Sequence, residues 1–143
     1  MGKRSESENM ISAVIVRRGV WRSNSTYRSV FDQFGSLPFD IQVMNIYDQL
    51  VPSGGATFWQ MKATSNGSFF LFPMKDKTKP VEIISPNGHR ACVSSEVSGL
   101  VATLFALRSV GSGESAGRAF IRLVEYARQQ PQFRSIDGVI AGL

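Results

Sequence analysis

The sequence has few of the side chains from which catalytic and metal sites are usually built. Among its 143 residues there is one cysteine, Cys92, and one histidine, His89. A single thiol excludes an internal disulfide or a site of several thiolates, and a single imidazole excludes a histidine-rich metal site. No apolar run approaches the ~20 residues that a membrane-spanning helix needs. These absences disfavour most common enzyme classes and exclude an integral membrane protein.

What is present is typical of a folded protein. Hydrophobic residues make up 43% of the chain and charged residues 19%, a balance that supports a substantial core. The length suits one domain, which we expect to span residues 10–143, after a polar and disordered tail at residues 1–9. This tail is not followed by an apolar segment with a cleavage site, so we expect no secretory signal and a cytoplasmic location.

Positive charge is concentrated at the start of the chain. The net charge is +5, and residues 1–28 hold six of the 16 basic residues against two of the 11 acidic ones. Such a segment can contact phosphate backbones without sequence preference, although charge of this kind is more often simply solvated. A net positive chain is a poor mimic of DNA, because a mimic needs a dense negative surface. The candidate nucleic-acid contacts are Arg17, Arg18, Arg22 and Arg28.

The spacing of apolar residues predicts an α+β fold. We expect an extended segment at 10–21, helices at 27–34 and 38–51, and short strands at 57–63, 68–72, 81–85 and 90–93. Consecutive short strands joined by tight turns predict a four-stranded antiparallel meander sheet packed against several helices. The strand at 68–72 is apolar on both faces and should be central and covered. The turn at Ser65-Asn66-Gly67 is expected to be type I′, because Asn-Gly accepts positive φ angles.

Two further helices are predicted in the second half. The helix at 97–107 is apolar on nearly all sides, so we place it in the core, across the sheet. Gly99 costs this helix about 1 kcal/mol relative to alanine, and a glycine there usually allows another backbone to come close. The helix at 116–129 is amphipathic, and a short helix or frayed tail follows at 132–143.

The amphipathic helix carries a group of basic residues on or near its exposed face. Arg118 and Arg122 repel each other at i,i+4 spacing, which favours contact with an outside partner over a ladder of internal ion pairs. The alternative is an ordinary solvated face. The candidate partner-binding residues are Arg118, Arg122 and Arg128.

The pair most similar to a nucleophilic site is His89 and Cys92, since an imidazole can activate a thiol. Strand alternation over 90–93, however, predicts that Cys92 points inward, where a thiol without a nearby cation is inert. The glycine clusters Gly54-Gly55 and Gly111-Ser112-Gly113 lack the lysine of a phosphate-binding loop and are interpreted as linkers. We therefore predict no catalytic, cofactor-binding or metal-ligating residues.

Several segments, taken in order, resemble the ArdB/KlcA antirestriction family. The resemblance covers about residues 26–136, and Ser68 stands where the family's turn has a second glycine. The matching segments are Arg28–Gly35, Leu50-Val51, Gly54–Gln60, Ser65–Pro73, Glu96–Leu107 with its Ala-Thr-Leu-Phe-Ala-Leu end, and Phe120–Ala127 ahead of Gln130-Pro131.

The resemblance implies a small, non-enzymatic protein of plasmids, phages or genomic islands that inhibits type I restriction–modification enzymes and protects incoming DNA. The implied partner is the restriction enzyme or an associated host protein, with no cofactor. From the absence of long apolar runs we also expect no membrane partner. It supplies no site residues, because the matched motifs are turn and core residues. The residues themselves leave a second hypothesis open, a nucleic-acid-associated accessory protein that uses the basic N-terminal segment.

Overall fold

The computed structural model describes residues 10–33, 38–53, 58–75, 78–109, 113–141 and 143. The expected tail at 1–9, Gly54-Gly55 and residues 111–112 lie outside these ranges. The α+β class is confirmed. The elements are β1 (Ala13–Val16), the 3-10 helix η1 (Arg18–Ser23), α2 (Ser25–Gln33), α3 (Phe39–Leu50), β2 (Trp59–Thr64), β3 (Phe69–Pro73), β4 (Val81–Ile84), β5 (Arg90–Val93), α4 (Ser95–Ser109), α5 (Glu114–Arg128) and α6 (Phe133–Ile140).

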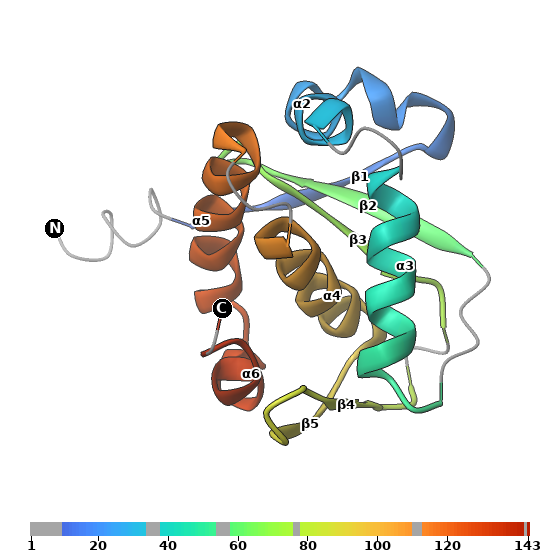
Figure 1. Cartoon of the computed structure of the whole chain (residues 1–143), viewed down its shortest axis with the longest axis vertical. Helices are drawn as coiled ribbons and strands as arrows, with labels where there is room; N and C mark the ends of the chain where they lie inside the picture. Colours follow the sequence, from blue (N-terminus) through green and yellow to red (C-terminus); the bar gives the residue numbers. More distant parts are fainter. Residues whose placement is uncertain (1–9, 34–37, 54–57, 76–77, 110–112, 142) are drawn as a thin grey trace, which may run out of the picture.

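The strands form two separate antiparallel sheets, so the predicted four-stranded meander is wrong. One sheet has the order β1-β2-β3, and the other is the hairpin β4-β5. The N-terminal extended segment supplies β1, with Ala13 opposite Thr64 and Val16 opposite Met61. The β4-β5 hairpin lies at the far end of the molecule from β1 and β2, close to α6 (Figure 1).

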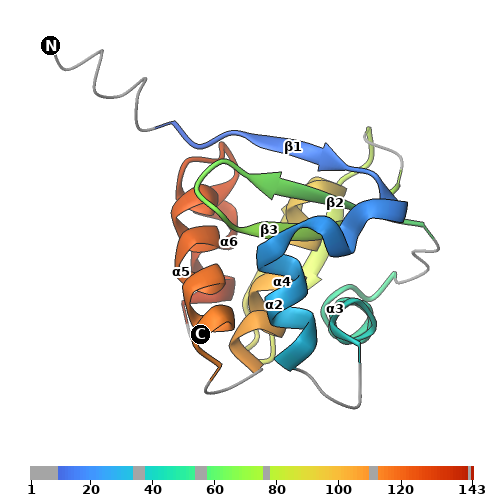
Figure 2. The same ribbon diagram turned by 90° about the horizontal axis from the view of Figure 1, so that it is seen from above.

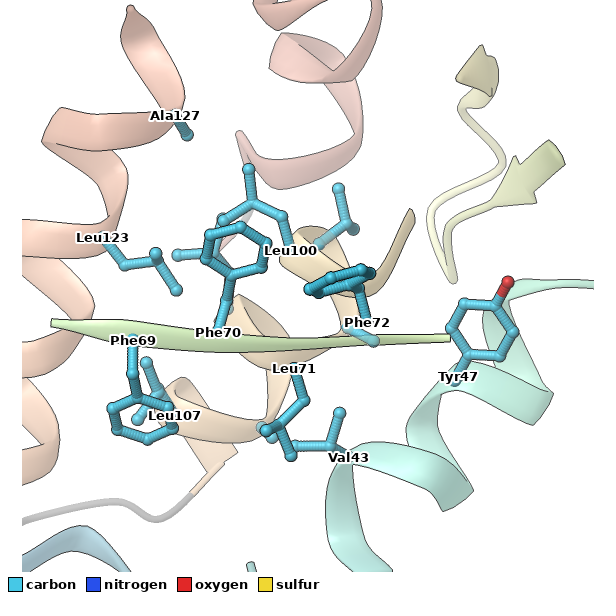
Figure 3. Close-up of a cluster of buried hydrophobic side chains, with 14 of the residues drawn as sticks. Val43, Tyr47, Phe69, Phe70, Leu71, Phe72, Leu100, Leu107, Leu123 and Ala127 are labelled. Atoms are coloured by element: carbon cyan, nitrogen blue, oxygen red, sulfur yellow. The ribbon is translucent and has the colours of Figure 1, made fainter. Parts of the chain in front are cut away.

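Helices cover both faces of the three-stranded sheet because β3 is apolar on both. All five residues of β3 are buried, and successive side chains of a strand point to opposite faces. On one face, the ring of Phe69 lies 5.3 Å from that of Tyr27 in α2 and 5.6 Å from that of Phe39 in α3. On the other, Phe70 stacks on Tyr126 of α5 at 5.6 Å. In Figure 3, the side chain of Phe69 lies on one side of β3 and that of Phe70 lies on the other.

The predicted central position of β3 is wrong, because β2 is the middle strand and β3 lies at an edge of the sheet. Helix α4 occupies this edge of β3, where the strand at 81–85 was predicted. An alanine Cβ at Gly99 would lie 2.3 Å from Phe72 Cα, so the expected close approach of another backbone is confirmed. The Thr103 hydroxyl accepts a hydrogen bond from Leu71 N–H at 3.0 Å and donates to the Gly99 carbonyl at 2.9 Å. The Thr103 hydroxyl thus gives the buried backbone N–H of Leu71 the hydrogen-bond partner that an adjacent strand would otherwise supply.

Two hairpin loops share one design. The loops are residues 65–67 and 86–88, and each ends in a glycine with positive φ, Gly67 at 90° and Gly88 at 86°. The glycine N–H donates to the carbonyl of the residue just before the loop, Thr64 at 3.1 Å and Ser85 at 2.9 Å respectively. No non-glycine residue among those described has positive φ, so the predicted type I′ turn at Asn66 is wrong. The pattern is that of a three-residue loop, a type I turn followed by a left-handed glycine.

The outer edge of β1 is the open edge of this sheet within the described residues (Figure 2). Val14 and Ile15 are 63% and 50% exposed. The strand is held at its ends as well as by β2. Ile11 N–H donates to Gln129 Oε1 at 2.7 Å, and Trp21 Nε1 donates to the Val16 carbonyl at 3.1 Å.

Candidate functional site

The four arginines predicted to contact nucleic acid do not form one patch. Arg18 lies over the ring of Trp21 at 5.8 Å, and Arg22 lies over that of Phe31 at 4.4 Å. Both line a cavity of about 430 Å³ beside η1 and α2. The two others, Arg17 and Arg28, are exposed but do not line it. The structure thus brings together two of the four, held against aromatic rings by cation–π contacts.

The same cavity includes a buried phenol and a carboxylate, Tyr27 and Asp40. Burial raises the pKa of Tyr27 to about 12, the Asp40 carboxylate adds to this increase, and Arg22 opposes it. The phenol therefore stays protonated at neutral pH. The Asp40 charge weakens the attraction of this cavity for phosphate, because it partly offsets Arg18 and Arg22.

Helix α5 carries the three arginines predicted to contact a partner, and the structure groups two of them. Arg118 and Arg122 line a cavity of about 130 Å³ that also involves α2. The third, Arg128, is exposed and lies outside this cavity. Arg118 also forms an ion pair with Glu114 at 2.9 Å, which the i,i+4 spacing of these two residues predicts.

The β2-β3 loop fixes α2 and α5 around this cavity. Asn66 Nδ2 donates to the Arg122 carbonyl at 2.8 Å, and Ser68 Oγ donates to the Ala119 carbonyl at 2.7 Å. From the other side, Thr26 Oγ1 donates to the Gly67 carbonyl at 3.0 Å. Ser68 thus ties the hairpin to α5 through a buried hydroxyl.

Gly67 also brings this loop against the arginine side chain. An alanine Cβ at position 67 would lie 3.0 Å from Arg122 Nη1. The guanidinium of Arg122 makes no ion pair or hydrogen bond within the described part of the chain. Arg122 is therefore positioned by its helix and the neighbouring loop while its donors remain available.

Sequence reasoning missed the hydroxyl side chains of this cavity, which are Ser25, Thr26, Ser29 and Ser115. The start of α2 does have a local signal, since Asn24 Oδ1 accepts a hydrogen bond from Tyr27 N–H at 2.9 Å and caps the helix. The approach of α2 to α5, however, depends on residues far apart in the sequence and has no local signal.

The predicted burial of Cys92 is wrong, because its thiol is exposed. In β5 the inward-facing residues are Ala91 and Val93, and Cys92 pairs with the exposed Glu82. The nearby His89 packs on α6, where a Cβ at Gly138 would lie 3.0 Å from its Nδ1. The alternation was predicted with the wrong phase, since Cys92 shares the outer face of this strand with the charged Arg90, two residues earlier.

Replacing Cys92 with serine is expected to change the free energy of unfolding by less than about 0.5 kcal/mol, as for most exposed substitutions. Urea unfolding of both proteins measures this difference. The same position predicts that Ellman's reagent modifies the thiol completely in the folded protein. Modification that requires denaturant would contradict the exposed position of this side chain.

The described ranges contain no cluster of three or more His, Cys, Asp or Glu side chains able to hold a metal ion. Within the same residues, each helix is too short or too polar to cross a membrane. The candidate site is therefore the pair of basic surfaces, one at η1 and one between α2 and α5.

Comparison with known proteins connects this chain to the antirestriction proteins. The antirestriction protein KlcA of Escherichia coli is 39% identical over 62 residues, which cover 43% of this chain and 41% of KlcA. A solved structure from work on KlcA and ArdB superposes with a TM-score of 0.71 at 23% identity, covering 91% of this chain and 94% of the other. That likeness shows a shared fold.

The family match is longer than the match to KlcA. The sequence pattern of the antirestriction protein family fits residues 53–141, from the segment before β2 to the end of α6. This range includes β3, α4 and the α5 arginines, and it begins after η1. The resemblance to ArdB and KlcA is thereby confirmed, and the chain belongs to the antirestriction protein family.

Proposed function

We propose that this chain protects incoming mobile DNA by inhibiting or modulating host type I restriction–modification enzymes through non-catalytic contacts in the cytoplasm. The observation that carries the proposal is the family match over residues 53–141. The solved relative comes from work on KlcA and ArdB that describes antirestriction activity against type I DNA restriction systems in vivo but not in vitro. Antirestriction by this chain should therefore be tested in living cells.

The charge of this chain supports a mode of action other than DNA mimicry. Its net charge is +5, so it would repel the basic surfaces by which a restriction enzyme holds DNA. Contact with an acidic region of the enzyme, or of an associated host protein, fits this charge better. The α5 surface around Arg118 and Arg122 lies within the family match and has one uncompensated guanidinium.

The experiment measures plating of unmodified phage on cells with and without an active type I system. We expect the wild-type protein to raise plating on the restricting host alone. The double charge reversal Arg118→Glu and Arg122→Glu should lower this protection by about tenfold or more, since reversed charges at a contact cost several kcal/mol. Arg128→Glu, in the same helix but outside the cavity, is the matched control.

Two further variants test the non-catalytic part of the proposal. His89→Gln and Cys92→Ser should retain full protection, and thermal unfolding should show that every variant is folded. Loss of protection with His89→Gln, while the arginine reversal remains active, would contradict a contact mechanism and favour catalysis. Equal protection on restricting and non-restricting hosts would contradict the antirestriction function itself.

A further inference from the structure

The cavity between α2 and α5 is lined by hydrogen-bond donors of several kinds. Its volume is about 130 Å³, which is below the ~300–1,000 Å³ of typical sites for organic ligands. No carboxylate lines it; the nearby Glu114 pairs with Arg118. The polar side chains that line it are Ser25, Thr26, Ser29, Ser115, Arg118 and Arg122.

Several of these donors are not used within the described residues. The hydroxyls of Ser25 and Ser115 and the guanidinium of Arg122 make no hydrogen bond there. By contrast, Thr26 donates to Gly67 and Ser29 donates to the Ser25 carbonyl at 2.9 Å. The Arg122 guanidinium can only donate, and the free hydroxyls of Ser25 and Ser115 can donate as well, so together these groups suit an anion.

The electrostatic setting also favours an anion. At the start of α2, the helix dipole places partial positive charge on the backbone N–H groups. Asn24 caps the N–H of Tyr27, and no acidic residue in the first turn offsets the remaining charge. The two guanidinium groups add full positive charges, of which one is offset by Glu114. A planar guanidinium presents paired N–H groups that match the oxygens of a phosphate.

From this arrangement we propose that the α2–α5 cavity binds a single tetrahedral oxyanion, a phosphate group, through Arg122, Ser25 and Ser115. The cavity has room for one such group and no room for a nucleoside beside it. Its walls are fixed in advance, because the β2-β3 loop is hydrogen-bonded to both helices. Preformed walls reduce the ordering cost of binding. The proposal does not depend on the antirestriction function.

The experiment is a titration of the full-length protein with inorganic phosphate at neutral pH and constant ionic strength, followed by NMR. We expect saturable shifts at the backbone amides of Ser25 and Ser115 and at Arg122 Nε–H. Arg122→Gln should weaken binding by about tenfold or more, because it removes a charge-assisted fork. Ser25→Ala, at an exposed position, should weaken it in a protein whose fold is unchanged.

Arg128→Gln is the matched control, because it removes the same charge from the same helix outside the cavity. Its affinity for phosphate should equal that of the wild type. Equal weakening by Arg122→Gln and Arg128→Gln, or shifts that never saturate, would overturn the proposal by showing a general charge effect.

A second arm identifies the source of the phosphate group. A short DNA duplex is added in place of inorganic phosphate, and the same resonances are followed. Shifts at Ser25 and Arg122 that inorganic phosphate competes away would identify a nucleic-acid backbone phosphate in this cavity. A response to inorganic phosphate alone would identify a free oxyanion. Absence of a response at these residues in both arms would overturn the proposal.

Discussion

Replacing Gly99 with alanine is expected to destabilise the protein by more than about 3 kcal/mol, above the usual cost of overpacking a core. The new Cβ would lie 2.3 Å from Phe72 Cα and 2.4 Å from the Leu71 carbonyl oxygen. These are backbone atoms of a buried strand, so no side chain can rotate away to make room. Helix α4 would have to move away from β3, which also lengthens the hydrogen bond between Thr103 and Leu71.

The matched control is Gly117→Ala in α5. Position 117 is exposed, and a Cβ there would meet nothing within 4 Å. The substitution should stabilise the protein by about 0.5–1 kcal/mol, which is the helix preference for alanine over glycine. Both free energies of unfolding are measured by urea denaturation. A Gly99→Ala protein as stable as the wild type would contradict the close packing of α4 on β3.

The second large effect is expected at Phe69. Its side chain is completely buried, and its ring makes edge contacts with Tyr27 at 5.3 Å and Phe39 at 5.6 Å. Phe69→Ala should reduce the free energy of unfolding by about 3–5 kcal/mol, because it leaves a cavity among three elements. The measurement is chemical denaturation at several temperatures, since a strongly destabilised variant is best followed in the cold.

Phe58→Ala serves as the control for Phe69→Ala. The Phe58 side chain is 66% exposed, so its removal should change stability by less than about 0.5 kcal/mol. Similar losses for the two variants would show that the aromatic cluster around β3 contributes little. That result would contradict the packing of α2 and α3 on this face of the sheet.

Helix α4 is the element that the sequence predicts most fully. A helix that is apolar on all sides is stable in a water-soluble fold only when other elements bury it on all sides. A glycine inside such a helix implies a neighbour that leaves no room for a side chain. Both predictions use local information, and both agree with the burial of Leu100, Val101 and Leu104 and with the contact at Gly99.

The pairing of the strands was not predictable in the same way. Turn residues place β4 next to β5 and β2 next to β3, and both pairings are observed. The neighbour of β2 on its other side is β1, about fifty residues earlier in the chain. The neighbour of β3 is Thr103 of α4. The hydrophobic periodicity of a strand does not show whether its edge will meet another strand or the hydroxyl of a helix.

The candidate site was predictable in part. The i,i+4 spacing of Arg118 and Arg122 places both on one face of a helix, and both do line one cavity. Arg128 is six residues beyond Arg122, which is not a whole number of helical turns, so it points elsewhere. The serines of α2 come from a segment about ninety residues away. Their presence depends on the loop contacts of Asn66 and Ser68, which no local pattern encodes.

The open edge of β1 also bears on self-association. Its unpaired backbone groups and the exposed Val14 and Ile15 would favour the addition of a strand from another copy, which leads to aggregates. This strand is only four residues long, and Arg17 and Arg18 follow it directly. Short edge strands and flanking like charges both oppose such growth, because few hydrogen bonds are gained and two copies repel. The same two arginines therefore help to keep copies of the protein apart.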